Sequence, residues 1–285
     1  MTIANWITAA QATLEENAVP TARLDCEVLL ADALNKDRSW IHAHPEHSLP
    51  ADMIQKLNAK ITRRAEHEPI AYIRGVQEFY GRDFRVSPDT LTPRPETETM
   101  IELLLSLLKK LKPNAQKLTI TDLGTGSGCI IITAALELSS ISSLSSTVSY
   151  TGLEISQPAL KLARQNADTL GVDIDFQQFD LLKDTLNHEP SALNIILANL
   201  PYVPNDFNIN LAASHEPEFA IYGGDDGLDY YREMFLQASN TQFIFTESLP
   251  PQHNKLTEIA AHSGYTLIKT QDFIQIFERH TASTD

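Results

Sequence analysis

Cysteine is scarce in this sequence: Cys26 and Cys129 are the only two among 285 residues, and they lie far apart and outside any metal-like spacing. This scarcity argues against a disulfide framework and predicts a reducing, cytoplasmic setting without a metal site. Long apolar runs are also lacking, because no stretch approaches the roughly 20 residues that a membrane-spanning helix needs. The first residues do not have the basic start of a secretory signal. No association with a membrane is therefore expected.

Basic side chains are few, with 22 lysines and arginines against 37 aspartates and glutamates and a formal net charge of −15. Phosphate backbones attract basic surfaces, so this charge disfavours a nucleic-acid substrate, although a local basic groove would still be compatible with one. The hydrophobic share of 42% is ordinary for a globular protein. The length is comfortable for two domains with separate cores.

The apolar pattern divides the chain into three parts. Residues 1–75 carry apolar side chains at helical spacing, interrupted by prolines and polar stretches, which predicts a small helical bundle. In residues 76–95, aromatic residues flank Gly81 and three prolines follow, which predicts a β-hairpin or an extended linker. Residues 96–285 are expected to form a second domain that begins with a helix near Glu96.

From residue 118 onwards, strand patterns alternate with helix patterns. This order predicts an α/β fold with a parallel, doubly wound sheet and a ligand at the carboxyl ends of its strands. One helix is expected to be capped by Ser156 at its start and Gly171 at its end. The predicted strands lie within 118–124, 148–155, 174–180 and 193–202, and the predicted helices between the first three are 129–138 and 156–171.

The sequence DLGTGSG at residues 122–128 lies directly after a predicted strand and before a predicted helix. Its glycines allow a sharp turn and let a ligand lie against the backbone. A nicotinamide site usually has the spacing G-x-G-x-x-G, whereas this loop has G-x-G-x-G after an acid, the pattern of class I methyltransferases. A plain tight turn is the alternative. The predicted cofactor-binding residues of the loop are Gly124, Thr125, Gly126, Ser127 and Gly128.

Two strand-end acids strengthen the prediction of a nucleotide-like cofactor. Glu154 ends the next predicted strand, where a carboxylate accepts hydrogen bonds from both hydroxyls of a ribose. It lies farther from the glycine loop than the usual ~20 residues, and a serine-rich stretch at 139–149, interpreted as a surface insertion, accounts for the excess. Asp180 is placed to accept from an adenine amino group, with Leu181 beside the base. A solvated strand-end acid is the alternative for Asp180.

The sequence Asn-Leu-Pro-Tyr at 199–202 follows the fourth predicted strand. An amide or aromatic amino nitrogen is a poor nucleophile because its lone pair is delocalised into the adjacent π-system. The side-chain oxygen of Asn199 and the main-chain oxygen of Leu200 are suited to accept from such an NH2 group and to align its lone pair with a methyl donor. The Tyr202 ring is expected to pack flat on the planar substrate group. We predict that the catalytic and substrate-binding residues are Asn199, which also borders the cofactor, Leu200, Pro201 and Tyr202.

Three further stretches carry a family resemblance that covers nearly the whole chain. Residues 68–98, EPIAYIRGVQEFYGRDFRVSPDTLTPRPETE, resemble the region that joins the two domains of HemK/PrmC-type protein-(glutamine-N5) methyltransferases. Residues 215–234, HEPEFAIYGGDDGLDYYREM, are similar to the segment that follows the catalytic turn in that family. The N-terminal pattern WITAAQATLEE…ARLDCEVLLADAL resembles its helical domain.

This resemblance implies an α/β, class I (Rossmann-like) S-adenosylmethionine-dependent methyltransferase domain with a small N-terminal helical bundle that helps to dock a protein substrate. S-adenosyl-L-methionine is then the donor and S-adenosyl-L-homocysteine the product. The implied partners are peptide chain release factors, methylated on the side-chain amide nitrogen (N5) of the glutamine in their Gly-Gly-Gln motif, and the enzyme is expected to be a monomer. The family's cofactor positions fall on Gly124 to Gly128, Glu154, Asp180 and Leu181, and its glutamine-binding turn falls on Asn199 to Tyr202.

Several alternatives stay open at this point. The family usually has N-P-P-Y, whereas this chain has Leu200, and the N-L-P-Y form also resembles the turn of rRNA adenine dimethyltransferases. Methylation of adenine in rRNA or DNA, methylation of a ribosomal-protein glutamine, and a non-catalytic cofactor-binding adaptor are therefore rival functions. The helical bundle is either a docking module or a generic cap. Arg94, Glu96 and Glu98 either line the mouth of the substrate site or cap and pair on the following helix.

Overall fold

The computed structural model describes residues 1–111, 117–139, 148–188 and 192–280. Most of the serine-rich stretch at 139–149 lies outside these residues. The chain forms two compact units. We call the first the helical unit, Met1–Val76 with Ile209–His215, and the second the sheet unit, Gln77–Asn208 with Glu216–Asp285. Among the described residues, no helix has the length and apolar character needed to cross a membrane.

The helical unit buries one apolar cluster between its longer helices. Trp6 and Leu14 are almost completely buried in it, as their helical spacing predicts. Leu30 is buried there as well. Asp37 caps one helix by accepting from the main-chain nitrogen of Trp40 at 2.7 Å. The helices are α1 (Ile3–Glu16), α2 (Ala22–Leu34), α3 (Arg38–Ala43), α4 (Ala51–Ala65) and α5 (Ile70–Arg74).

A short segment from much later in the chain, Ile209–His215, also belongs to the helical unit. The Nε2 atom of its last residue, His215, lies 3.0 Å from the main-chain oxygen of Glu66, just after α4. The sequence pattern places this segment within the second domain, because nothing in its local composition links it to the helices. The division of the chain into functional domains at residues 75 and 95 stays a prediction.

The junction between the units contains the hairpin that the sequence allowed. Strands β1 (Val76–Phe79) and β2 (Arg82–Arg85) pair across Tyr80 and Gly81, both of which have positive φ. Phe79 and Phe84 are fully buried and pack on the core of the sheet unit. The chain then continues without regular structure to η1 (Pro95–Thr97) and the helix α6 (Glu98–Leu111).

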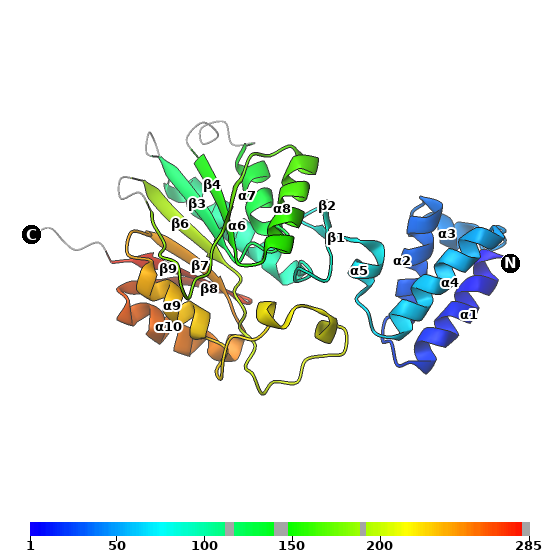
Figure 1. Cartoon of the computed structure of the whole chain (residues 1–285). Helices are drawn as coiled ribbons and strands as arrows, with labels where there is room; N and C mark the ends of the chain where they lie inside the picture. The colour runs from blue at the N-terminus through cyan, green and yellow to red at the C-terminus, as the bar shows by residue number, and fades with distance from the viewer. Residues whose placement is uncertain (112–116, 140–147, 189–191, 281–285) are drawn as a thin grey trace, which may run out of the picture. The chain divides into compact units, whose positions relative to one another are not determined.

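The sheet unit is built on a seven-stranded sheet with the order β5-β4-β3-β6-β7-β9-β8 (Figure 1). The predicted parallel pairing is confirmed, because β5, β4, β3, β6 and β7 run parallel and only β9 pairs antiparallel with both of its neighbours. Strand order reverses at β3, which creates a crevice there. The strands are β3 (Leu118–Leu123), β4 (Val148–Glu154), β5 (Asp175–Gln178), β6 (Leu193–Ala198), β7 (Phe243–Glu247), β8 (Tyr265–Gln271) and β9 (Ile274–Arg279).

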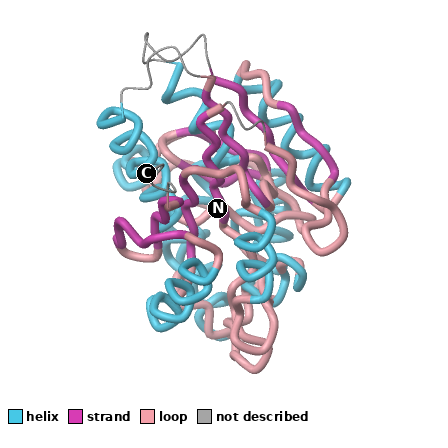
Figure 2. The backbone as a smooth tube through the Cα atoms, turned by 90° about the vertical axis from the view of Figure 1, so that its left-hand side faces the viewer, coloured by secondary structure: helices cyan, strands magenta, loops and turns pink. Residues whose placement is uncertain are grey.

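Helices cover both faces of this sheet (Figures 1 and 2). Side chains alternate along the buried strands, so that in β6 Ile195 faces the cluster with α6, α7 and α8, while Ile196 faces the cluster with α9 and α10. The predicted caps of α8 are confirmed, with Ser156 accepting from a main-chain nitrogen and Gly171 in the left-handed region. These helices are α7 (Cys129–Ser139), α8 (Gln157–Leu170), α9 (Asp229–Gln237) and α10 (His253–His262).

Candidate active site

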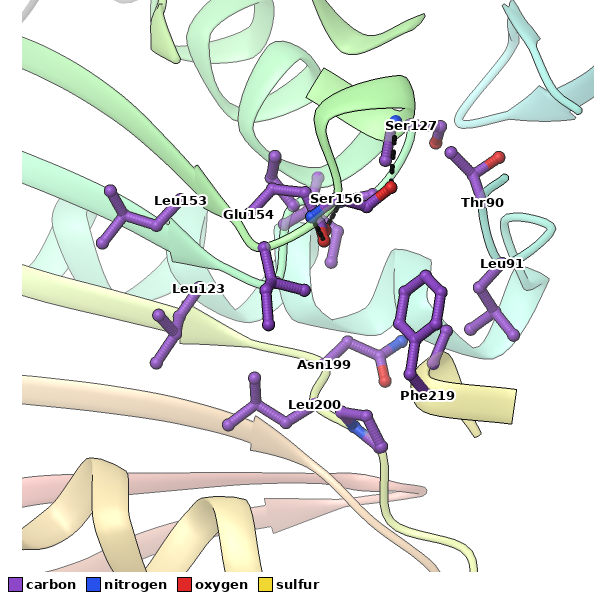
Figure 3. Close-up of a pocket in the computed structure, with 18 of the residues that line it drawn as sticks. Thr90, Leu91, Leu123, Ser127, Leu153, Glu154, Ser156, Asn199, Leu200 and Phe219 are labelled. Carbon is purple, nitrogen blue, oxygen red and sulfur yellow. Dashed lines mark hydrogen bonds between the residues drawn. The ribbon is translucent and has the colours of Figure 1, made fainter. Parts of the chain in front are cut away.

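A pocket of about 500 Å³ opens at the carboxyl ends of β3, β4 and β6, within the sheet unit (Figure 3). This is the crevice where a doubly wound sheet binds its ligands, and the volume is that of a small-molecule site. The sequence predicts twelve site residues, and all except Gly128 and Tyr202 line this pocket. The ten are Gly124, Thr125, Gly126, Ser127, Glu154, Asp180, Leu181, Asn199, Leu200 and Pro201.

The glycine loop after β3 is held against the end of β4. The main-chain nitrogens of Gly124 and Thr125 both donate to the main-chain oxygen of Leu153, at 2.8 and 2.9 Å. Gly126 has φ +54°, and a Cβ atom built on it would meet nothing within 4 Å. Its backbone therefore borders open space, which leaves room for a ligand to approach.

Gly128 has a packing role, unlike the other glycines of the loop. A Cβ atom there would lie 2.8 Å from Cδ1 of Ile132 and 3.3 Å from Cβ of Ala163. The absence of a side chain thus lets α8 pack closely against the start of α7. Gly128 is not among the residues that line the pocket, so any contact with a cofactor at this position stays a prediction.

Glu154 is the last residue of β4, and it is 7% exposed. Its two carboxylate oxygens accept from the main-chain nitrogens of Gly126 at 3.0 Å and Ser156 at 2.9 Å. Burial raises the pKa of this carboxyl, while the backbone hydrogen bonds oppose the shift. Each carboxylate oxygen keeps a further lone pair. The arrangement therefore fits a ligand with neighbouring hydroxyls, such as a ribose.

Asp180 lies two residues beyond β5 and also borders the pocket. Its carboxylate accepts from Nζ of Lys183 at 2.6 Å and from the main-chain nitrogen of Leu182 at 3.0 Å. The Lys183 hydrogen bond lowers the pKa of this carboxyl. Its two neighbours in sequence, Phe179 and Leu181, also line the pocket. An apolar slot edged by an ionised acid suits a heteroaromatic ring with an amino group.

Asn199 stands one residue after the end of β6, and in the sheet β3 lies between β6 and β4, the strand that ends at Glu154. Its Nδ2 atom donates to Oγ1 of Thr97 at 3.1 Å. This bond fixes the amide group so that Oδ1 is the end left to accept. The main-chain nitrogen of Leu200 donates to the hydroxyl of Tyr231 at 3.2 Å. The turn is therefore held by side chains from η1 and α9.

Tyr202 lies outside the lining of the pocket. Its hydroxyl donates to Oε1 of Glu247 at 3.2 Å, and burial raises its pKa. Glu247, the last residue of β7, is 1% exposed, and burial raises the pKa of its carboxyl to about 7. In this structure the Tyr202 ring anchors the turn to β7. Its packing on a substrate stays a prediction.

The linker before η1 supplies a wall of the pocket, which the sequence predicts only as one of two alternatives. Arg94 lines the pocket and pairs through Nη2 with Oε2 of Glu216 at 2.6 Å. The side chain of Glu216 is 1% exposed, and its other oxygen accepts from the main-chain nitrogen of Thr92 at 3.3 Å. Glu98 instead accepts from the main-chain nitrogen of Tyr80 at 2.8 Å. Glu96 is not among the residues that line the pocket.

Other lining residues carry no motif and are found only in the structure. They are apolar or hydroxyl side chains from three separate segments, and Figure 3 shows the ring of Phe219 close to Asn199. Only the family resemblance of residues 68–98 and 215–234 pointed to these segments. They include Thr90, Leu91, Phe219, Ala220 and Tyr230.

Two family models match this chain. The model of the PrmC N-terminal domain matches residues 5–75, and a model described as a methyltransferase domain matches residues 114–221. The first match covers the helices α1 to α5 of the helical unit, and the second covers the glycine loop, Glu154 and the turn at Asn199.

Curated relatives match most of the chain. The release factor glutamine methyltransferase of Koribacter versatilis (strain Ellin345) is 38% identical over 238 residues, which is 82% of this chain and 80% of that protein. The release factor glutamine methyltransferase of Bacillus anthracis is 34% identical over 219 residues, or 75% of this chain and 74% of that protein.

A solved structure agrees on the fold. The hMettl16 catalytic domain, crystallised in complex with the MAT2A 3'UTR hairpin 6, superposes with a TM-score of 0.51 at 13% sequence identity. The match covers 82% of this chain and 84% of that one. At this identity the likeness concerns the fold alone. The sheet order, the family model and this match together confirm the predicted class I methyltransferase fold.

Proposed function

Since this chain belongs to the family of release factor glutamine methyltransferases and is an S-adenosylmethionine-dependent protein glutamine methyltransferase, we propose that it methylates release factors on one particular atom. That atom is the side-chain amide nitrogen, N5, of the glutamine in the Gly-Gly-Gln motif. The one observation that carries the proposal is the orientation of Asn199, whose Nδ2 is committed to Thr97 while its Oδ1 is free to accept.

A primary amide has two N–H donors and a delocalised nitrogen lone pair. Two acceptors in fixed directions hold the NH2 group and favour the form of the nitrogen whose lone pair points at the methyl donor. The side-chain oxygen of Asn199 and the main-chain oxygen of Leu200 are adjacent and are both held by neighbouring groups. S-adenosylmethionine supplies the electrophilic methyl group when bound. The methylated nitrogen loses a proton readily after the transfer, so no base has to act before it.

The cofactor roles follow from the geometry of the pocket. We propose that the glycine loop contacts the methionine part of the cofactor and that Glu154 accepts hydrogen bonds from the two ribose hydroxyls. Asp180 and Leu181 contact the adenine. The open space beside Gly126 and the unused lone pairs of Glu154 support this assignment. The product that leaves the same site is S-adenosylhomocysteine.

The helical unit is proposed to dock the release factor. Its match to the PrmC N-terminal domain supports a role particular to this family. The segment Ile209–His215 is part of that unit and lies in sequence between the turn at Asn199 and the pocket residue Phe219. The chain thus leaves the sheet unit and returns to it between two parts of the active site.

Methyl transfer from labelled S-adenosylmethionine tests the substrate. The whole chain is incubated separately with a release factor, with the same factor carrying Gln→Ala in its Gly-Gly-Gln motif, with ribosomal protein and with rRNA. We expect label in the intact release factor alone, and mass spectrometry should place one methyl group on the glutamine side chain. Label in the Gln→Ala factor would refute the proposed atom. Preferential labelling of ribosomal protein or rRNA would favour those substrates instead.

A further inference from the structure

The hydroxyl of Tyr231 contacts the backbone of the catalytic turn. Tyr231 lies in α9, and its side chain is fully buried. The hydroxyl oxygen accepts from the main-chain nitrogen of Leu200 at 3.2 Å. It also lies within hydrogen-bond distance of two main-chain oxygens, that of Glu247 and, at 3.3 Å, that of Leu200 itself. One side chain therefore meets the backbone that follows β6 and the backbone at the end of β7.

The number of hydrogens decides how these contacts are used. A tyrosine hydroxyl has a single hydrogen and accepts through its lone pairs. The Glu247 oxygen is the nearer of the two acceptors and receives that hydrogen. The N–H of Leu200 occupies a lone pair of the hydroxyl. The main-chain oxygen of Leu200 therefore keeps its own lone pairs for another donor.

We propose that Tyr231 is a positioning residue for methyl transfer: it fixes the Leu200 peptide so that the oxygen of this peptide stays available to the second N–H of the substrate amide. That this amide belongs to a glutamine of a release factor rests on the proposed function. Tyr231 itself does not line the pocket, so its effect passes through Leu200.

The residue at position 200 explains why such a partner is needed. Leu200 is 5% exposed, and a buried N–H without an acceptor is costly. Proline at this position would have no N–H, and its ring would fix φ. Leucine has a main-chain N–H, and its φ is not fixed by a ring. The Tyr231 hydroxyl accepts from this N–H and thereby also restrains the backbone of Leu200. The Leu200 side chain adds a second restraint, because it packs against Gly124. Its Cδ2 atom lies 3.2 Å from the position that a Cβ atom on Gly124 would occupy.

The first test removes the hydroxyl with Tyr231→Phe in the whole chain. We expect kcat for methylation of the release factor to fall at least about tenfold, since one of the two oriented acceptors is released. The Kd for S-adenosylmethionine, measured by calorimetry, should stay within about twofold because Tyr231 does not border the pocket. A kcat above half of the unsubstituted value would overturn the proposal.

Tyr265→Phe is the matched control. Tyr265 belongs to the same apolar cluster, is 1% exposed, and its hydroxyl also bonds main-chain oxygens, those of Ala238 and Thr241. It contacts no residue of the turn through these bonds. The control should lower the melting temperature while leaving kcat within about twofold. An equal loss of kcat in both variants would show a general effect of core stability and would count against positioning by Tyr231.

The second test repeats the substitution in a chain that has no N–H at position 200. With Leu200→Pro as the reference, adding Tyr231→Phe should change kcat by less than about threefold, because the donor that Tyr231 satisfies is gone. A loss of tenfold or more in this background would contradict the proposal. The comparison is made within each background, so it does not depend on how active the Leu200→Pro enzyme is.

A third measurement needs neither activity nor a variant. Hydrogen exchange of the Leu200 amide in the unsubstituted protein should be as slow as that of the amides in β6, and exchange at the solvent-exposed rate would overturn the proposal. If the unsubstituted enzyme fails to methylate a release factor, the proposed function fails, while the protection of the Leu200 amide still reports on Tyr231. The two failures are therefore distinguishable.

Discussion

The Nδ2 atom of Asn199 donates to Thr97, and Oδ1, the other end of the amide, is left for the substrate. The importance of one such acceptor is large when charge redistributes in a transition state, because the acceptor is already oriented before the reaction starts. A carboxylate at the same place would accept equally well but would add a negative charge beside a cationic donor. Neutrality and direction are therefore both required at position 199.

Replacing Asn199 with alanine tests this requirement. We expect kcat with a release factor to fall by about a hundredfold or more, while the affinity for S-adenosylmethionine changes much less, since the claimed interaction is with the glutamine. Asn199→Asp should also be impaired. Asn187→Ala, at an exposed loop position, serves as the control. Near-normal turnover of a folded Asn199→Ala enzyme would contradict the mechanism.

The buried carboxyl of Glu247 makes stability depend on pH. Burial raises its pKa from 4.5 to about 7 in the folded protein, so the folded state holds a proton that the unfolded chain has already released. The contribution to stability is therefore complete below about pH 4.5 and is lost as the pH rises through 7.

Glu247→Gln should remove this dependence. Between pH 4.5 and 7, the free energy of unfolding of the unsubstituted protein should fall relative to the variant, by up to about 1.4 kcal/mol per pH unit. Urea unfolding at several pH values measures the difference. Asp122, whose pKa burial also raises to about 7, titrates in both proteins and cancels in the comparison. Parallel pH profiles would show that Glu247 is ionised in the folded state.

At the scale of elements, the ion pair of Arg94 and Glu216 joins the linker before η1 to the segment that precedes η3 (Glu218–Ala220). The linker lines the pocket, and so do Phe219 and Ala220 of η3, although the two parts lie far apart in sequence. The carboxylate is buried and the guanidinium is about half exposed. Loss of the arginine alone leaves a buried charge without its partner, which is more costly than loss of both.

A double-mutant cycle with Arg94→Ala and Glu216→Ala measures the pair. We expect a coupling of about 1–3 kcal/mol in the free energy of unfolding. The same cycle at Lys255 and Glu258, an exposed pair at 3.4 Å, should give less than about 1 kcal/mol. If the two couplings are equal, the Arg94–Glu216 contact does not hold the pocket wall.

At the scale of the whole molecule, the helical unit is not a continuous piece of chain. Ile209–His215 contributes to it from within the sequence of the sheet unit. Removing residues 1–75 therefore takes away the partners of this segment as well as the proposed docking surface. A test of docking has to separate binding of the cofactor from recognition of the protein substrate.

A chain that lacks residues 1–75 should still bind S-adenosylmethionine, because every pocket residue lies in the sheet unit. It should lose methylation of the whole release factor. We further expect the intact enzyme to have a much lower KM for the factor than for a short peptide with the Gly-Gly-Gln motif. Equal activity of the folded, truncated enzyme on the whole factor would mean that the helices are only a structural cap.

The sequence by itself determined the features that depend on local patterns. Helical spacing marked residues 1–75, and the alternation from residue 118 marked the parallel sheet, because periodicity reflects which face of an element is buried. The glycine loop and the turn at Asn199 were recognisable because each is a continuous motif at the end of a strand. Their shared pocket followed from the rule that parallel strands place their carboxyl ends at one edge.

Only the tertiary structure decided the contacts between segments distant in sequence. Arg94 and Glu216 are 122 positions apart, and Tyr231 meets the Leu200 backbone 31 positions away. No local pattern encodes such pairs, because they arise when whole elements pack against one another. The same reason applies to Ile209–His215, whose place in the helical unit its composition does not reveal. Local sequence therefore specified the motif residues of the active site, and packing specified the other residues that line the pocket and the contacts that hold the motifs in position.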